Sequence, residues 1–160
     1  MTAESSERTA TPLQSRWFDD YAVGEVFEFG QHEVTEQEII GFARQYDPQP
    51  FHVDPKVGAA SPYGGLIASG WMTAALAMRM MCDHYVPQQS AMASPGVEQL
   101  RWLHPVRPGD RLRLRVSILA VQRSRSKPDR GVVTARQEVI NQHGQTVMSL
   151  DGKSMLRVRP

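Results

Sequence analysis

The stretch from residue 70 to residue 85 limits the choice of folds more than any other part of the chain. Its sequence, GWMTAALAMRMMCDHY, is apolar on nearly every side. A helix without a wide polar face has to be surrounded by other elements. We therefore expect a central helix from Gly70 to about Tyr85, enclosed by the rest of the chain. Its methionines either pack the core or line an acyl pocket, since flexible thioethers adapt to varied chains, and we favour core packing.

The second half of the chain changes to a period of two, which is typical of strands. The clearest strand is 111–118, where arginines alternate with apolar residues and are expected to form a solvated face. Further strands are expected at 96–104, 131–140 and 145–158, the last two joined by a hairpin turn at 141–144. Before the helix, a strand at 25–34 leads to a capping box formed by Thr35 and Glu38. This order of elements predicts an α+β fold.

Residues 42–70 combine an acid, an imidazole and a helix start. A helix that begins at Thr35 must stop near Asp47, because Pro48 and Pro50 lack backbone donors and restrict the residues before them. The link from Asp47 to His52 is therefore expected to be bent or extended. Asp54 and Pro55 then predict a helical turn through residue 60.

A second helix start follows at Ser69 and Gly70, which we interpret as N-cap and first helical residue. The first amides of a helix have no partner within it and can bind an oxygen that gains negative charge. Gly70 leaves its own amide open to a ligand because it has no side chain. From the residues alone the plainer interpretation stays open, since Asp-Pro is common in turns and a single histidine is more often structural.

The motif Asp47-Pro-Gln-Pro-Phe-His52, followed by SPYGGLIASG at 61–70, resembles the signature of the MaoC-like dehydratases, which include the (R)-specific enoyl-CoA hydratases. The resemblance covers about residues 17–158 and implies a hotdog fold, a curved antiparallel sheet wrapped around one long helix. It also implies that Asp47 and His52 are catalytic and that the Gly70 amide is the oxyanion donor. Gln49 stands where the family usually has Asn.

By the same resemblance the reaction is the reversible hydration of a trans-2-enoyl-CoA to the (R)-3-hydroxyacyl-CoA. Coenzyme A is then part of the substrate, no separate cofactor is expected, and the protein is at least a homodimer. In this mechanism His52 takes a proton from water and Asp47 exchanges the second proton. We expect Asp47 to keep its proton longer than a free Asp, because the C-terminal end of a helix disfavours negative charge.

We further expect six residues to contact the substrate. Three lie near the motif, and three lie in a basic connection between strands, where cationic side chains could hold the phosphates of coenzyme A; an ordinary solvated hairpin is the alternative there. They are Gln49, Gly65, Ser69, Arg123, Arg125 and Lys127.

Composition adds several expectations. The 160 residues predict a single domain at 16–160, after a polar, disordered tail at 1–15. The single cysteine, Cys82, excludes an internal disulfide and favours the cytoplasm. A net charge of +1 gives no support to a nucleic-acid partner. No segment is apolar over the length that a membrane requires, and no histidine pairing predicts a metal site.

Two other functions remain open at this level. A hotdog thioesterase usually places its acid on the central helix, where this chain has only Asp83 near the far end. A non-catalytic subunit that only binds an acyl thioester is the other, and Gln49 is the feature that favours it.

Overall fold

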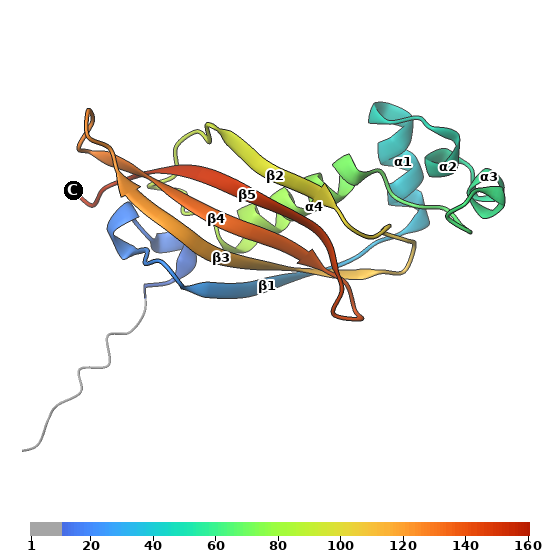
Figure 1. Cartoon of the computed structure of the whole chain (residues 1–160), viewed down its shortest axis with the longest axis horizontal. Coiled ribbons are helices and arrows are strands. Elements are labelled where there is room, and N and C mark those ends of the chain that lie inside the picture. Colours follow the sequence, from blue (N-terminus) through green and yellow to red (C-terminus); the bar gives the residue numbers. More distant parts are fainter. Residues whose placement is uncertain (1–10) are drawn as a thin grey trace, which may run out of the picture.

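The computed structural model describes residues 11–160, which form a five-stranded antiparallel sheet and a long helix along one face of it (Figure 1). The helix is α4 (Gly70–His84), with Ser69 as its N-cap. The sheet order is β1-β3-β4-β5-β2, from β1 (Val26–Glu33), β2 (Gly96–Trp102), β3 (Arg111–Arg123), β4 (Arg130–Ile140) and β5 (Thr146–Arg157). The predicted α+β class and hotdog architecture are confirmed.

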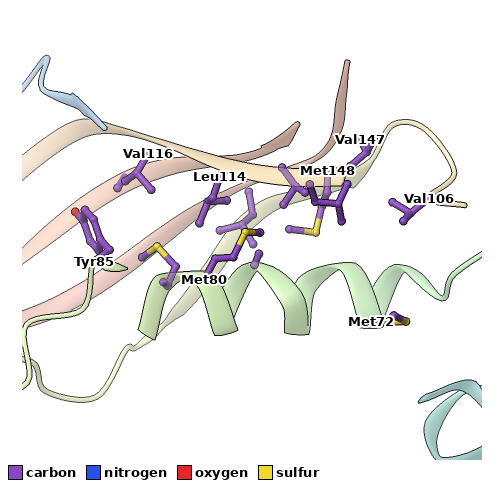
Figure 2. Packing of buried hydrophobic residues seen from close by; sticks show 14 of the residues in the cluster. Met72, Met80, Tyr85, Val106, Leu114, Val116, Val147 and Met148 are labelled. Carbon is purple, nitrogen blue, oxygen red and sulfur yellow. The ribbon is translucent and has the colours of Figure 1, made fainter. Parts of the chain in front are cut away.

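The core lies between α4 and the sheet. Figure 2 shows Met80 of α4 facing Leu114 of β3, with Met148 of β5 farther along the same layer. Met80 is 4% exposed, and Leu114 and Met148 are 0% exposed. Burying a side chain of this size contributes roughly 1.5–3 kcal/mol. The preferred interpretation of the methionines therefore holds for Met72, Met80 and Met81, whereas Met78 is exposed.

The arginines of β3 lie on the opposite, solvated face of the sheet, as expected. Arg115 pairs with Glu28 of β1 at 2.7 Å, and Arg113 approaches the same carboxylate at 3.6 Å. All three side chains are more than one third exposed. Such pairs contribute little stability because water screens them, so this face carries no part of the candidate site.

Three helices cap one end of the sheet. They are α1 (Glu36–Tyr46), α2 (Pro50–Val53) and α3 (Pro55–Ala60) (Figure 1). The predicted capping box is present in α1, since the Thr35 side chain accepts from the Glu38 amide and the Glu38 carboxylate accepts from the Thr35 amide. Asp54 caps α3, as predicted.

The disordered tail predicted at residues 1–15 is too long, because the structure describes the chain from residue 11 onward. Residues 1–10 lie outside the described residues, but Leu13–Ser15 form a short 3₁₀ helix. The Gln14 amide donates to the carbonyls of Cys82 and Asp83 at the end of α4. A second 3₁₀ helix, Phe18–Asp20, packs the Phe18 ring directly over Gly131 of β4. None of the helices in residues 11–160 has the length and apolarity needed to cross a membrane.

Candidate active site

Asp47 lies at the point where α1 ends. Its backbone N–H still donates to the Ala43 carbonyl at 2.9 Å, but its φ of −151° and ψ of 67° are not helical. Pro48 cannot supply the next backbone donor, so the helix cannot continue. Pro48 therefore determines the residue at which α1 ends, and so places the Asp47 carboxylate at the end of the helix.

His52 returns to Asp47 through a helical turn. The bent or extended path that we expected is present at Asp47 and Gln49, which are not helical, but residues 50–53 form α2 with Pro50 in its first position. Proline is well suited to that position, since its φ is already helical and its missing N–H has no partner there anyway. The turn brings His52 Nε2 to 3.4 Å from Asp47 Oδ2.

The position of the His52 proton follows from its other nitrogen. The ring is 5% exposed, and Nδ1 lies 2.7 Å from the Ile67 carbonyl oxygen. A carbonyl can only accept, so Nδ1 must carry the proton. In the neutral ring Nε2 is then unprotonated, and its lone pair lies beside a carboxylate oxygen. A water molecule that donates one hydrogen to each acceptor satisfies both.

Two neighbours keep Asp47 ionised. Gln49 Nε2 donates to Asp47 Oδ1 at 2.7 Å. This bond is the main cause that lowers the pKa of Asp47, followed by a hydrogen bond from Ser69 and the charge of His52. The expectation that Asp47 retains its proton is therefore wrong. Hydrogen bonds to a charged group contribute roughly 1.5–3 kcal/mol each, more than the roughly 0.3–1 kcal/mol of a helix dipole.

Gly70 presents its amide at the start of α4. Within the described residues no acceptor takes the Gly70 N–H, while the carbonyl of Gly70 accepts from Trp102 Nε1 at 2.9 Å. A Cβ at residue 70 would lie 2.4 Å from the Trp102 ring. Glycine is therefore required here for the close approach of an indole, in addition to leaving its amide open.

A cavity of about 340 Å³ brings the imidazole and this helix start together. Its size falls in the range of small-molecule sites. The cavity is lined by Phe51, His52, Tyr63, Ile67, Ala68, Gly70, Thr73, Trp102, Leu103, His104, Pro105 and Val106. Asp47 is not part of this lining, but its Oδ2 lies 3.4 Å from the Nε2 of His52, which does line the cavity.

The six predicted substrate contacts divide into three groups. Gln49 and Ser69 contact Asp47, and Ser69 is 0% exposed, so both position the carboxylate. Gly65 lies against Arg107, whose Nη1 would be 3.1 Å from a Cβ at residue 65.

The third group, Arg123, Arg125 and Lys127, lies in the β3–β4 connection at the other end of the sheet from α1–α3 (Figure 1). On β5, Arg157 at the level of this loop lies nine residue steps after Met148, which pairs with Trp102. At about 3.3 Å per residue this is about 30 Å. Within one protomer these cations therefore do not reach the cavity, and Arg123 instead donates to the Pro128 carbonyl.

Sequence reasoning missed four residues around the cavity. Trp102, Tyr63 and His104 line it, and Arg107 donates to the Tyr63 carbonyl at 2.5 Å. The sequence pattern places Trp102 only in an alternating strand, because a two-residue period does not indicate which residues pack against Gly70. A large aromatic at the end of an edge strand was the one available signal. Among residues 11–160, no cluster of three or more His, Cys, Asp or Glu side chains is arranged to hold a metal ion.

The chain matches a known protein family over most of its length. The MaoC-like domain matches residues 20–143, which is most of the chain and includes the whole motif. The chain belongs to the MaoC-like dehydratase family. The MaoC-like dehydratase from Rhodospirillum rubrum has the same fold, with a TM-score of 0.86 and 39% identity over 91% of this chain and 99% of that one.

Two relatives of this MaoC-like domain carry names that state an activity. The 3-hydroxyacyl-thioester dehydratase Z of Mycobacterium tuberculosis is 36% identical over 91 residues, 56% of this chain and 60% of that protein. The 3-hydroxybutyryl-CoA dehydratase of Methylorubrum extorquens is 26% identical over 151 residues, 91% of this chain and 86% of that protein. Both names state a dehydratase activity, which belongs to the hydro-lyase class.

The Gln49 hydrogen bond gives a prediction on pH. Replacing Gln49→Leu removes the main cause that lowers the Asp47 pKa, so that pKa should rise. The carboxyl resonance of Asp47, followed by NMR, should therefore titrate at higher pH in the variant than in the wild type. Turnover at neutral pH should fall by about tenfold to a hundredfold, the worth of one hydrogen bond to a charged group.

The matched control is Gln45→Leu, an exposed glutamine on α1. Its Asp47 titration curve should overlay that of the wild type. An unmoved Asp47 titration in Gln49→Leu would show that this bond does not set the ionisation of Asp47.

Proposed function

We propose that this MaoC-like domain catalyses the reversible hydration of a trans-2-enoyl thioester, carried on coenzyme A, to the (R)-3-hydroxyacyl thioester. The observation that carries the proposal is the arrangement of three groups. His52 Nε2 lies 3.4 Å from the Asp47 carboxylate while Nδ1 is bonded to the Ile67 carbonyl, and Gly70, whose N–H has no acceptor in the described residues, lines the same cavity as His52. Adding water across a polarised double bond needs these three functions.

In the proposed reaction, Asp47 and His52 Nε2 each accept a hydrogen bond from one water molecule. As the water oxygen bonds to C3, one of its protons passes to Nε2 and the C2–C3 π electrons move toward C1. The thioester oxygen gains negative charge, which the Gly70 N–H stabilises. The imidazolium then returns its proton to C2. One water molecule has been added, and dehydration follows the same steps in reverse.

The ionised state of Asp47 gives it a role different from the one expected. A carboxylate with a lowered pKa is a poor proton donor, so His52 carries the proton in both directions. Asp47 orients the water and stabilises the imidazolium 3.4 Å away. The Nδ1–H bond to Ile67 keeps Nε2 as the only exchanging nitrogen.

A homodimer is also part of the proposal. Strand β2 is an edge of the sheet and pairs only with β5 among the described strands. Exposed apolar side chains gather on β2, the residue after it and the outward side of α4: Trp71, Met78, Val97, Trp102 and Leu103. Unpaired backbone N–H and C=O groups next to exposed apolar side chains are suited to pairing with the same strand edge of a second copy of the chain. Light scattering should give twice the 18.0 kDa chain mass; a monomer at working concentration contradicts this pairing.

The experiment that tests the function uses crotonyl-CoA and trans-2-octenoyl-CoA. Hydration removes the conjugated double bond, and mass spectrometry should find the substrate plus one water, with the thioester intact. Free coenzyme A as the product would identify a thioesterase instead. No candidate acid for that reaction lies near the cavity on α4, because Asp83 is at its far end, paired with Arg79 at 2.9 Å. Tight binding without any product would identify a non-catalytic subunit.

A further inference from the structure

A second cavity lies on the other side of the Trp71–Trp102 pair from the active site. It has a volume of about 360 Å³ and lies between α4 and strands β2, β4 and β5. Trp71 lines this cavity and Trp102 lines the catalytic one, and their rings meet edge to face with centroids 5.1 Å apart. If the proposed function holds, the acyl chain of a thioester at Gly70 reaches this cavity past the two indoles.

The walls of this second cavity are mostly apolar, as an acyl chain requires. They include Ala74, Met78 and Met81 of α4 and Leu100 of β2, with further aliphatic residues from β4 and β5. A purely hydrocarbon ligand needs no hydrogen bond from such walls. Polar groups that face the cavity without a partner are therefore informative about the ligand.

Gln137 presents an unpartnered polar group to the cavity. It occupies a position on β4 whose neighbours two residues away are the buried Val139 and Ala135, so it points from the sheet toward α4. Its amide nitrogen would be 2.7 Å from a Cβ at residue 152, which makes Gly152 a recess for the amide. No hydrogen bond within residues 11–160 engages this amide, and it lines the cavity.

Tyr21 also lines the cavity, but its hydroxyl is not open to it. The residue is 6% exposed and the hydroxyl oxygen is buried, so a ligand in the cavity does not reach it. The Tyr85 phenol lies beside it, with ring centroids 6.2 Å apart, and burial raises the pKa of Tyr21 to about 12. The two phenols therefore belong to the packed wall of the cavity.

The charges around the cavity favour a neutral ligand group. Among the described residues that line it, Lys153 alone is charged, and it is bonded to Glu98 at 2.5 Å. Arg16 packs over the Tyr21 ring at 5.2 Å, but it is bonded to Glu25 at 3.0 Å. A carboxylate on the acyl chain would therefore lose its water without gaining an unpaired cation.

We propose that this cavity selects acyl chains that carry a neutral oxygen, as a ketone or hydroxyl group, and that Gln137 is the specificity-determining residue. The inference rests on the proposed function, because it concerns the acyl part of that substrate. The Gln137 amide donates a hydrogen bond to the chain oxygen. A plain chain of the same length covers the amide without satisfying it, which is how polar groups reject an apolar analogue.

The experiment compares trans-2-decenoyl-CoA with esters of the same length that carry one keto group at each successive carbon beyond C4. At least one keto ester should have a kcat/KM about tenfold or more above the plain ester, the worth of one hydrogen bond. Gln137→Met keeps the side-chain length without the amide, and it should remove that preference. A plain ester preferred over every keto ester overturns the proposal.

One exposed position provides a matched control, Gln122→Met on β3. It should leave the ratio of keto to plain ester unchanged.

Binding separates this inference from the proposed reaction. In the Asp47→Asn background, the affinity of plain and keto esters can be measured by thermal shift without turnover. Selective binding of a keto ester that is lost in Gln137→Met upholds the pocket even if the wild type hydrates no ester. Equal binding of both ester types overturns the pocket's selectivity even if hydration is fast.

Discussion

Asp47→Asn should lower kcat/KM for hydration by roughly 10²–10⁴-fold, the range of a group that serves acid–base catalysis. The carboxylate binds the water and stabilises the imidazolium through its negative charge, which an amide of the same shape lacks. Gln49 and Ser69 now donate to this carboxylate, and the amide oxygen of Asn can still accept one of those bonds. The fold should persist. The measurements are initial rates on trans-2-enoyl-CoA esters and a thermal melt.

The control for this substitution is Asp54→Asn. Asp54 is an exposed carboxylate seven residues along the chain that caps α3 by accepting from the Lys56 amide at 2.8 Å. Asparagine caps a helix as well as aspartate does, so turnover and melting should stay near wild type. If Asp47→Asn is as active as this control on every ester that the wild type accepts, Asp47 is not part of the reaction.

His52→Ala should cause a loss of the same size, roughly 10²–10⁴-fold, because His52 is the imidazole beside the Asp47 carboxylate that takes the proton from the bound water. It should also lower the melting temperature, since the Ile67 carbonyl loses its 2.7 Å hydrogen bond. Leaving a buried acceptor unpaired costs roughly 1–3 kcal/mol. Activity and stability can be separated with His52→Asn, whose amide nitrogen can replace Nδ1 but which has no Nε2.

The expected result is that His52→Asn is as inactive as His52→Ala but melts closer to the wild type. His143→Ala, in the exposed turn between β4 and β5, controls for loss of an imidazole and should keep full activity. The double variant with Asp47→Asn should be little worse than either single variant, because groups that act as one unit are not additive. Fully additive losses would mean that the two residues act independently.

Much of the fold could be predicted because its signals are local. The capping box at Thr35 and Glu38, the cap at Ser69 and the alternation of β3 each depend on residues a few positions apart, and each is present as predicted. The link from Asp47 to His52 was predicted less well. Proline disfavours helix in the residue before it but favours helix when it is the first residue itself, and at Pro50 the second effect prevails.

The site was predictable only where its parts are close in sequence. Asp47, His52 and Gly70 share one stretch, so a motif could bring them together. Trp102 lies 32 residues after Gly70 and depends on how β2 packs against α4. The ionisation of Asp47 depends on where the Gln49 amide turns, which no periodicity encodes. The basic residues at 123–127 were assigned by charge alone, and the length of the sheet separates them from the cavity.

The atom that fixes the His52 proton belongs to the main chain. The Ile67 carbonyl accepts from Nδ1, while the next residue, Ala68, donates its N–H to Val106 at 2.8 Å. A main-chain carbonyl is present whatever side chain residue 67 carries, so a codon change there cannot delete it. The tautomer of this histidine is therefore protected against most single mutations at the position that determines it. During divergence, residue 67 is free to vary in size and reshape the cavity wall while the proton on His52 stays in place.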